Sequence, residues 1–112
     1  MSRLQWNVYI ARVSFVESED QKLRPVIVMS EPVGDYKIVV VAPIYSVKPT
    51  HSLIGDIDIK ADQLAMGLIR ESTIRLHRMV SLPLDDFEQH LGQAPPSVQA
   101  DIKAGIKGLF SL

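Results

Sequence analysis

The chain has 112 residues, no cysteine, and a formal net charge of −1 at pH 7. Its length suits a single domain, and an apolar fraction of 46% can supply one hydrophobic core. The composition excludes disulfides and thiolate chemistry, and the net charge excludes a bulk electrostatic attraction to nucleic acid, so nucleic-acid binding would need a local basic patch. The N-terminal residues contain no apolar run long enough for a signal peptide or a membrane span, so we expect a soluble, cytoplasmic protein without membrane association.

Alternating apolar residues predict three strands in the first half of the chain. The first spans residues 7–15 and is followed by a polar, charged stretch at 16–23 that predicts a surface loop. A second strand is expected at 25–30. The third, at 36–44, is apolar on both faces and is therefore expected to be central in a sheet, with Pro43 ending it because proline cannot donate a ladder hydrogen bond.

The second half predicts shorter strands and then helices. Strands are expected at 55–59, 69–76 and 79–82, with a second long loop at 45–53 and a helical turn at 61–65. Apolar residues spaced by three and four predict a helix over 84–91 and another from 96 to 109, with Ser97 as its N-cap. The pattern predicts a mainly β protein with C-terminal helices, a small and strongly bent sheet or SH3-like barrel.

The segment from Gln21 to Ser30 is the most informative for function. A charged stretch ends at Arg24, Pro25 follows, and four apolar residues then predict a buried strand. Proline fixes its own φ and biases the preceding residue toward an extended conformation, so the Arg24 side chain is aimed by a stiff backbone. From these ten residues alone, both a functional arginine and a solubilising arginine that closes a loop remain open.

Five segments in the same order resemble the PemK/MazF-type toxins of bacterial type II toxin–antitoxin systems. The Arg-Pro-Val strand motif of that family is matched by Arg24 to Ser30, and its Ala-Pro-Ile-Thr-Ser strand end by Ala42 to Ser46. The remaining matches are the opening Trp6-Asn7-Val8-Tyr9 strand, Gly67-Leu68 with Ser72-Thr73-Ile74-Arg75, and the closing Leu109-Phe110-Ser111-Leu112. The resemblance covers nearly the whole chain.

The resemblance implies one PemK/MazF-like domain over residues 1–112 that forms a homodimer and cleaves single-stranded mRNA at selected sequences. It implies no cofactor and no metal. The 2′-hydroxyl of the RNA would attack the adjacent phosphate, which needs a base, an acid and positive charge at the phosphorane. A cognate antitoxin would inhibit the enzyme by laying a flexible acidic segment over the groove that contains Arg24 and Arg75.

By the same resemblance, Arg24 and Arg75 are expected to stabilise charge on the phosphate, because a guanidinium fork suits that ligand. Some family members have an aspartate as the base at the position of His77. A histidine can accept a proton at neutral pH, so we predict His77 as the general base, on the same face of a strand as Arg75. The alternative is a solvated histidine on a polar strand face.

Tyr45 departs from the family, which usually has a threonine that binds the scissile phosphate. Either Ser46 supplies the short hydroxyl instead, or Tyr45 stacks on a base, or Tyr45 is a rim residue without a role. Gln21 and Lys22 are expected to touch RNA from a mobile loop, although a plain surface loop explains them equally well. Arg70 and Arg78 extend the predicted basic strip, and they rank below Arg24 and Arg75.

Two other functions stay open at this stage. One is a catalytically impaired relative that binds RNA or a protein without cutting, since Tyr45 and His77 both depart from family patterns. The other is a gyrase-directed toxin of the same fold, although the Arg-Pro strand favours the RNA-cutting branch. A metal site is not predicted, because no ligand spacing joins the candidate side chains and solvated faces explain them better: Asp56, Asp58, His51 and His90.

Overall fold

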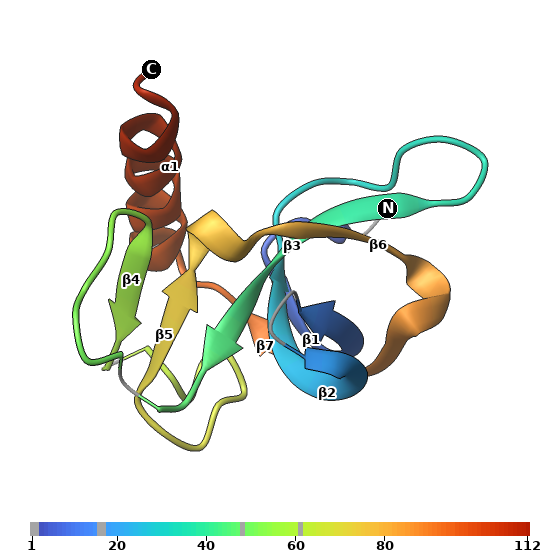
Figure 1. The fold of residues 1–112 in the computed structure, drawn as a ribbon, viewed down its shortest axis with the longest axis horizontal. Helices are drawn as coiled ribbons and strands as arrows, with labels where there is room; N and C mark the ends of the chain where they lie inside the picture. Colours follow the sequence, from blue (N-terminus) through green and yellow to red (C-terminus); the bar gives the residue numbers. More distant parts are fainter. Residues whose placement is uncertain (1–2, 16–17, 48, 61) are drawn as a thin grey trace.

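The computed structural model of the chain describes residues 3–15, 18–47, 49–60 and 62–112, and it is a bent antiparallel sheet with one α-helix at its side (Figure 1). The strands are β1 (Asn7–Phe15), β2 (Ser18–Val28), β3 (Ile38–Tyr45), β4 (Asp56–Ile59), β5 (Ser72–Arg75), β6 (Val80–Pro83) and β7 (Phe87–Gln93). The helix α1 spans Pro96–Phe110, and two short 3₁₀ helices, η1 (Leu76–Arg78) and η2 (Leu84–Asp86), flank β6. The predicted mainly β class is confirmed.

The sheet has the order β4-β5-β3-β2-β1-β7, and β6 pairs with β3 outside this path. The central position predicted for the third strand is confirmed, because β3 contributes Val39 and Val41 to one buried cluster and Ala42 and Ile44 to another. Its predicted end at Pro43 is wrong. Residues 38–41 pair with β6 and residues 44–45 pair with β5, so Pro43 lies where β3 changes partners, at a point where the missing N–H costs little.

The surface loop predicted at residues 16–23 is also wrong for the part that the structure describes. β2 begins at Ser18 and pairs with β1 from Phe15↔Ser18 through Val13↔Lys22 to Val8↔Ile27. Polar side chains are compatible with a strand whose backbone groups are satisfied by a neighbouring strand. The long β1–β2 hairpin thus carries Lys22 and Arg24 on a paired strand, and this gives the Arg24 backbone a rigid mount.

The helix predicted over residues 84–91 does not form, so the chain has one C-terminal helix among its described residues where two were expected. After η2, β7 pairs with β1 in a register with two irregularities, such as Val8↔Gly92 and Tyr9↔His90. Long-range pairing to the otherwise open edge of β1 outweighs the local helical period. Of the helical turn predicted at 61–65, the structure describes residues 62–65, which form a hydrogen-bonded turn and not a helix.

The last helix is confirmed, with Val98 and Ile102 buried against the core and Ile106 and Leu109 packed beside them. Its predicted cap is wrong: Pro95 occupies the N-cap position, and the Ser97 hydroxyl donates to Asp62 Oδ2 at 3.1 Å. In Figure 1 the helix stands beside β4 and η1, away from the β1–β2 hairpin. No helix of the described chain is long and apolar enough to cross a membrane.

Candidate active site

Arg24 lies in β2 opposite Ala11 of β1, and Pro25 follows it directly. Its side chain is half-buried, and its guanidinium carbon lies 5.0 Å from the centre of the Tyr45 ring. At this distance the aromatic face attracts the cation. Two features therefore restrict the orientation of Arg24: the paired strand that holds its backbone and the aromatic ring beside its guanidinium.

Tyr45 is the last residue of β3 and pairs with Thr73 of β5. Burial raises the pKa of its hydroxyl above the ordinary value of 10, although the positive charges of Arg24 and Arg75 oppose this shift. The phenol is thus protonated at neutral pH and lies within electrostatic reach of both arginines. Tyr45 thus lies near both Arg24 of β2 and Arg75 of β5, which are far apart in sequence.

A groove of about 490 Å³ opens beside Arg24. Its walls come from β2 and from the segment that precedes β5, and the end of β3 lies between them. The residues that line it are Lys22, Leu23, Arg24, Pro25, Ile44, Ser46, Leu68, Ile69, Arg70 and Ser72. Three of these are cations and none is an Asp or Glu, so this local surface is basic although the whole chain has a net charge of −1.

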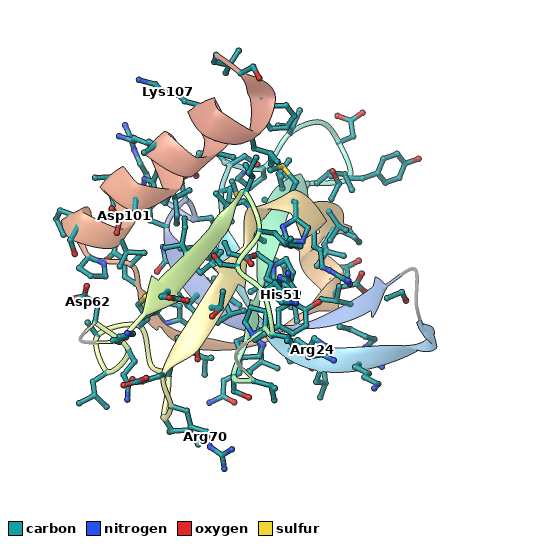
Figure 2. All side chains as sticks on the ribbon, turned by 60° about the vertical axis from the view of Figure 1, so that its left-hand side comes forward. Arg24, His51, Asp62, Arg70, Asp101 and Lys107 are labelled. Carbon is teal, nitrogen blue, oxygen red and sulfur yellow. The ribbon has the colours of Figure 1, made fainter. Side chains whose placement is uncertain are left out.

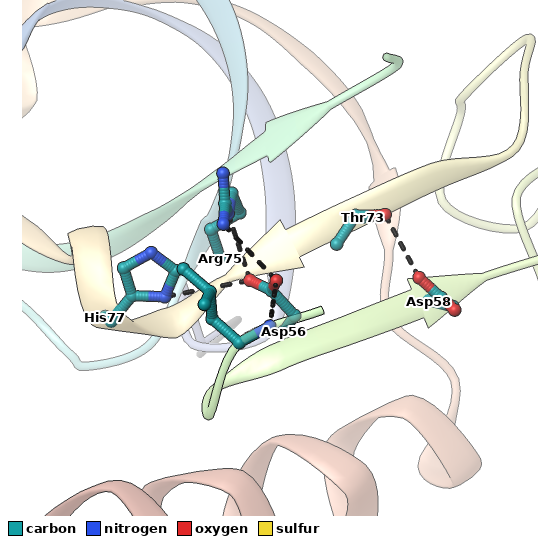
Figure 3. Close-up of polar contacts among 6 residues, drawn as sticks. Asp56, Asp58, Thr73, Arg75 and His77 are labelled. Carbon is teal, nitrogen blue, oxygen red and sulfur yellow. Dashed lines mark hydrogen bonds and ion pairs between the residues drawn. The ribbon is translucent and has the colours of Figure 1, made fainter. Parts of the chain in front are cut away.

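A second cluster is built on Asp56, whose side chain is only 2% exposed (Figure 3). Arg75 donates to it from Nε at 3.0 Å and from Nη2 at 3.3 Å, and the Leu53 amide donates to Oδ2 at 2.9 Å. His77 Nδ1 lies 3.6 Å from Asp56 Oδ1, which is too long for a hydrogen bond but close enough for an electrostatic contact. We call Asp56, Arg75 and His77 the buried ionic cluster.

This cluster corrects two expectations. Asp56 is not a solvated strand residue, since its carboxylate is buried under Arg75. The fifth strand is shorter than predicted and ends at Arg75, so His77 lies in η1 and does not share a strand face with Arg75. The two side chains nevertheless meet, because both turn toward Asp56. The signal that sequence reasoning missed is the β4–β5 register, which sets Asp56 opposite Arg75 and Asp58 opposite Thr73.

The other predicted site residues are divided between these two places. Ser46 is exposed and lines the groove together with Lys22. Gln21 belongs to β2, but its side chain lies outside the described residues. Arg78 is half-buried in η1 and does not line the groove. Arg70, which ranked below the other arginines, lies on the groove wall.

The residues considered for a metal have other surroundings. Asp58 accepts a hydrogen bond from Thr73 at 3.1 Å, and His90 Nε2 lies 2.8 Å from Asn7 Oδ1. Across residues 3–15, 18–47, 49–60 and 62–112, no three His, Asp or Glu side chains gather in a way that would hold a metal ion.

Comparison with solved structures shows the same fold in bacterial toxins. The Mycobacterium tuberculosis toxin MazF-mt6 superposes with a TM-score of 0.74 at 21% identity, over 95% of this chain and 97% of that one. An endoribonuclease from a Mycobacterial species, solved with its cognate antitoxin, gives 0.73 at 12% identity over 99% and 97%. MazF from Deinococcus radiodurans gives 0.69 at 16% identity over 99% and 97%.

The sequence itself was compared with curated proteins and with protein families. No curated protein matches the chain. The family described as PemK-like, MazF-like toxin of type II toxin–antitoxin system matches residues 4–110, which is nearly the whole chain. The chain therefore belongs to the PemK-like, MazF-like toxins of type II toxin–antitoxin systems.

Proposed function

We propose that this toxin is an endoribonuclease that cleaves single-stranded RNA at selected sequences, with the 2′-hydroxyl of the substrate as the nucleophile. The observation that carries the proposal is the basic groove at Arg24, on a chain of this family. A groove of this kind attracts the phosphate backbone locally while the protein as a whole is nearly neutral. RNA is the expected substrate because DNA lacks the attacking hydroxyl.

In the proposed cleavage reaction, one proton leaves the attacking 2′-hydroxyl and one proton is added to the leaving 5′-oxygen. The 2′-oxygen bonds to phosphorus as a base removes its proton, the bond from phosphorus to the 5′-oxygen breaks, and an acid protonates that leaving oxygen. The products are a 2′,3′-cyclic phosphate and a 5′-hydroxyl end. The transition state carries extra negative charge on the phosphoryl oxygens, so it is stabilised by a cation that is already in place.

Arg24 is the residue that we assign to this charge. Its planar guanidinium can donate two parallel hydrogen bonds to a phosphate, and the Tyr45 ring and the paired strand restrict its orientation. Ser46 is exposed at the same groove and would supply the short hydroxyl that orients the phosphate. Tyr45, expected to touch RNA, would then act mainly by holding Arg24.

We assign the general base to His77 and a supporting role to Arg75. The side chain of His77 is 23% exposed, and its Nδ1 side faces the buried Asp56 carboxylate, which would stabilise the protonated ring after it accepts the 2′-hydroxyl proton. Arg75 donates two hydrogen bonds to Asp56, so the carboxylate neutralises its charge inside the protein. We therefore expect Arg75 to hold the site together more than to bind the phosphate.

The proposal includes partners and setting. An antitoxin is the expected inhibitor, because related structures are described as an endoribonuclease with its cognate antitoxin and as a MazE–MazF complex. A homodimer of single-domain subunits, acting in the cytoplasm where mRNA is found, completes the proposal. Gel filtration together with chemical cross-linking would test the dimer, and a monomer at all concentrations would contradict it.

The decisive experiment for the function is to incubate the purified protein with mixed-sequence RNA in the presence of a chelator and to map the new ends. We expect discrete cuts with 5′-hydroxyl ends, and no cut where the nucleotide before the cleavage point is 2′-deoxy. An RNA that binds but stays intact would indicate a catalytically impaired relative. Cleavage that needs added metal would contradict the metal-independent mechanism.

A further inference from the structure

We propose, resting on the function proposed above, that residues 68–72 form the second wall of a nucleotide-binding subsite, in which Ile69 and Leu23 hold one base and Arg70 binds a neighbouring phosphate. Both this segment and β2 line the groove, so Lys22, Arg24 and Arg70 belong to one continuous basic surface. Figure 2 shows Arg24 and Arg70 on the same side of the molecule, while Lys107 projects from α1 on the other side.

The wall is held rigidly because two glycines let backbones touch behind it. A Cβ on Gly67 would lie 2.2 Å from the Leu91 carbonyl oxygen, and a Cβ on Gly92 would lie 2.7 Å from the Ala65 carbonyl oxygen. Gly67 also has a φ of +74°, which other residues adopt only with strain. The turn at 62–67 is therefore packed directly on β7, and the residues that follow leave it in a fixed direction.

The segment is fixed again on its far side. Leu68 is 6% exposed and belongs to the core, and the Ser72 hydroxyl donates to the Arg70 carbonyl oxygen at 3.0 Å. Between these anchors, Ile69 is 86% exposed. A largely exposed isoleucine on a stiff segment is poorly placed for the core and well placed for a ligand.

An apolar residue lines the groove on the other wall as well. Leu23 of β2 is 59% exposed and lines the same groove as Ile69. A nucleobase is flat and apolar on both faces, so a base inserted between the two side chains would remove both from water. The groove volume of about 490 Å³ falls in the range of small-ligand sites and can accommodate a nucleotide.

The charges then match the backbone of the nucleotide. Lys22 and Arg24 stand on one wall and Arg70 on the other, so successive phosphates of a single strand that crosses the groove meet a cation on each side. Apolar side chains that hold a base and cations that hold its phosphates are the two features that single-stranded RNA requires. The identity of the base would be set by the shape of the gap between Leu23 and Ile69.

The test measures binding without cleavage. A fluorescent single-stranded RNA with 2′-fluoro in place of every 2′-hydroxyl is titrated by anisotropy at several salt concentrations, using wild type, Arg70→Ala, Ile69→Ser and Lys107→Ala. Each contact with a phosphate contributes about 0.7 to the slope of log affinity against log salt for single strands. Lys107 is exposed on α1 and serves as the matched loss of one positive charge away from the groove.

We expect Arg70→Ala to reduce that slope by about 0.7, Lys107→Ala to leave it unchanged, and Ile69→Ser to weaken binding severalfold with the slope unchanged. If wild type binds while Arg70→Ala keeps the full slope, the subsite is wrong and the proposed function stands. If wild type does not bind the RNA at any salt concentration, the proposed function fails and the subsite fails with it.

Discussion

Two arginines, Arg24 in β2 and Arg75 in β5, lie on strands on either side of β3 and are held in opposite ways. Arg24 lies over an aromatic ring at the wall of a basic groove. Arg75 is 16% exposed and donates two hydrogen bonds to a carboxylate that is 2% exposed. The difference shows that the surroundings of a guanidinium determine its role: one charge faces a surface where a phosphate can bind, and the other is balanced in the interior.

The physical cost of each arrangement also differs. A buried carboxylate that loses its cation is left as an unpaired charge in a medium of low dielectric constant, which is strongly unfavourable. A cation on an aromatic face contributes much less to folding. We therefore expect mutations of the groove residues and of His77, the assigned base, to affect cleavage, and mutations of Asp56 and Arg75 to affect mainly folding.

The largest effect is expected from Arg24→Ala. Loss of a positioned cation at a phosphoryl transition state should lower the single-turnover cleavage rate by about 10³-fold. The free energy of unfolding should fall by less than it does for Arg75→Ala, because a cation–π contact contributes about 0.5–2 kcal/mol, which is less than the loss of one partner of a buried ion pair. The cleavage rate of Arg24→Lys should fall between those of wild type and Arg24→Ala, since lysine keeps the charge but lacks the planar guanidinium that donates two parallel hydrogen bonds.

A quench-flow cleavage assay paired with urea denaturation measures both quantities. A variant that stays folded and cleaves at the wild-type rate would remove Arg24 from the chemistry.

Arg75→Ala should give the reverse pattern. We expect the free energy of unfolding to fall by about 3–5 kcal/mol, because Asp56 would remain buried without its cation. The double variant Asp56→Ala/Arg75→Ala should lose less than the sum of the two single variants, since no uncompensated charge remains. Additive losses in urea denaturation would show that the ion pair does not couple the two residues.

The groove wall offers a third comparison, between two glycines with similar backbone angles. Gly67 and Gly34 have φ of +74° and +77°, but a Cβ on Gly34 would have no atom within 4 Å. Gly34→Ala should cost only the strain of the left-handed conformation, about 1–2 kcal/mol. Gly67→Ala should cost at least about 2 kcal/mol more, because β7 would have to move as well. If thermal denaturation showed the same loss of stability for Gly67→Ala and Gly34→Ala, the turn would not be packed against β7.

The smallest effect concerns the pH dependence at Tyr45. Burial raises its pKa in the folded state, so the folded protein holds this proton more tightly than the unfolded chain does. The associated stability is complete below about pH 10 and is lost as pH rises through the folded pKa. Tyr45→Phe has no proton to lose at this position, so it should not show this loss of stability at alkaline pH. Urea denaturation of both proteins, at pH values below and above the titration of Tyr45, would detect the difference. Parallel curves for the two proteins would contradict the shift.

Much of the fold could be predicted from local patterns. The first strand, the central third strand and the last helix were correct because the apolar pattern within each segment matches its own burial. The predictions for residues 18–23, the described part of the expected loop, and for residues 84–91 were wrong because both stretches pair with β1, and no pattern within either stretch reveals that pairing. A polar composition predicts exposure, but it does not exclude a strand.

The site was predictable to a similar extent. The Arg-Pro sequence identified Arg24 as a stiffly held side chain, since that property is local. The buried ionic cluster was missed because it depends on the register between β4 and β5, which no single segment determines. The position of Arg70 on the groove wall could not be predicted for the same reason, because it depends on a turn that packs on β7.

The central claim is that the charge of Arg24 acts on RNA while the charge of Arg75 acts on Asp56. The most direct measurement is the single-turnover cleavage rate of the paired variant Asp56→Asn/Arg75→Gln, which removes both charges and keeps an acceptor for the Leu53 amide. Neutralising a buried ion pair as a pair often has little effect on folding. We therefore expect a folded protein that is slower than wild type, because the carboxylate beside His77 is lost, but that still cleaves faster than Arg24→Ala, whose rate falls by about 10³-fold. A folded variant that cleaves as slowly as Arg24→Ala would show that Arg75 belongs to the chemistry and would contradict the division between the two arginines.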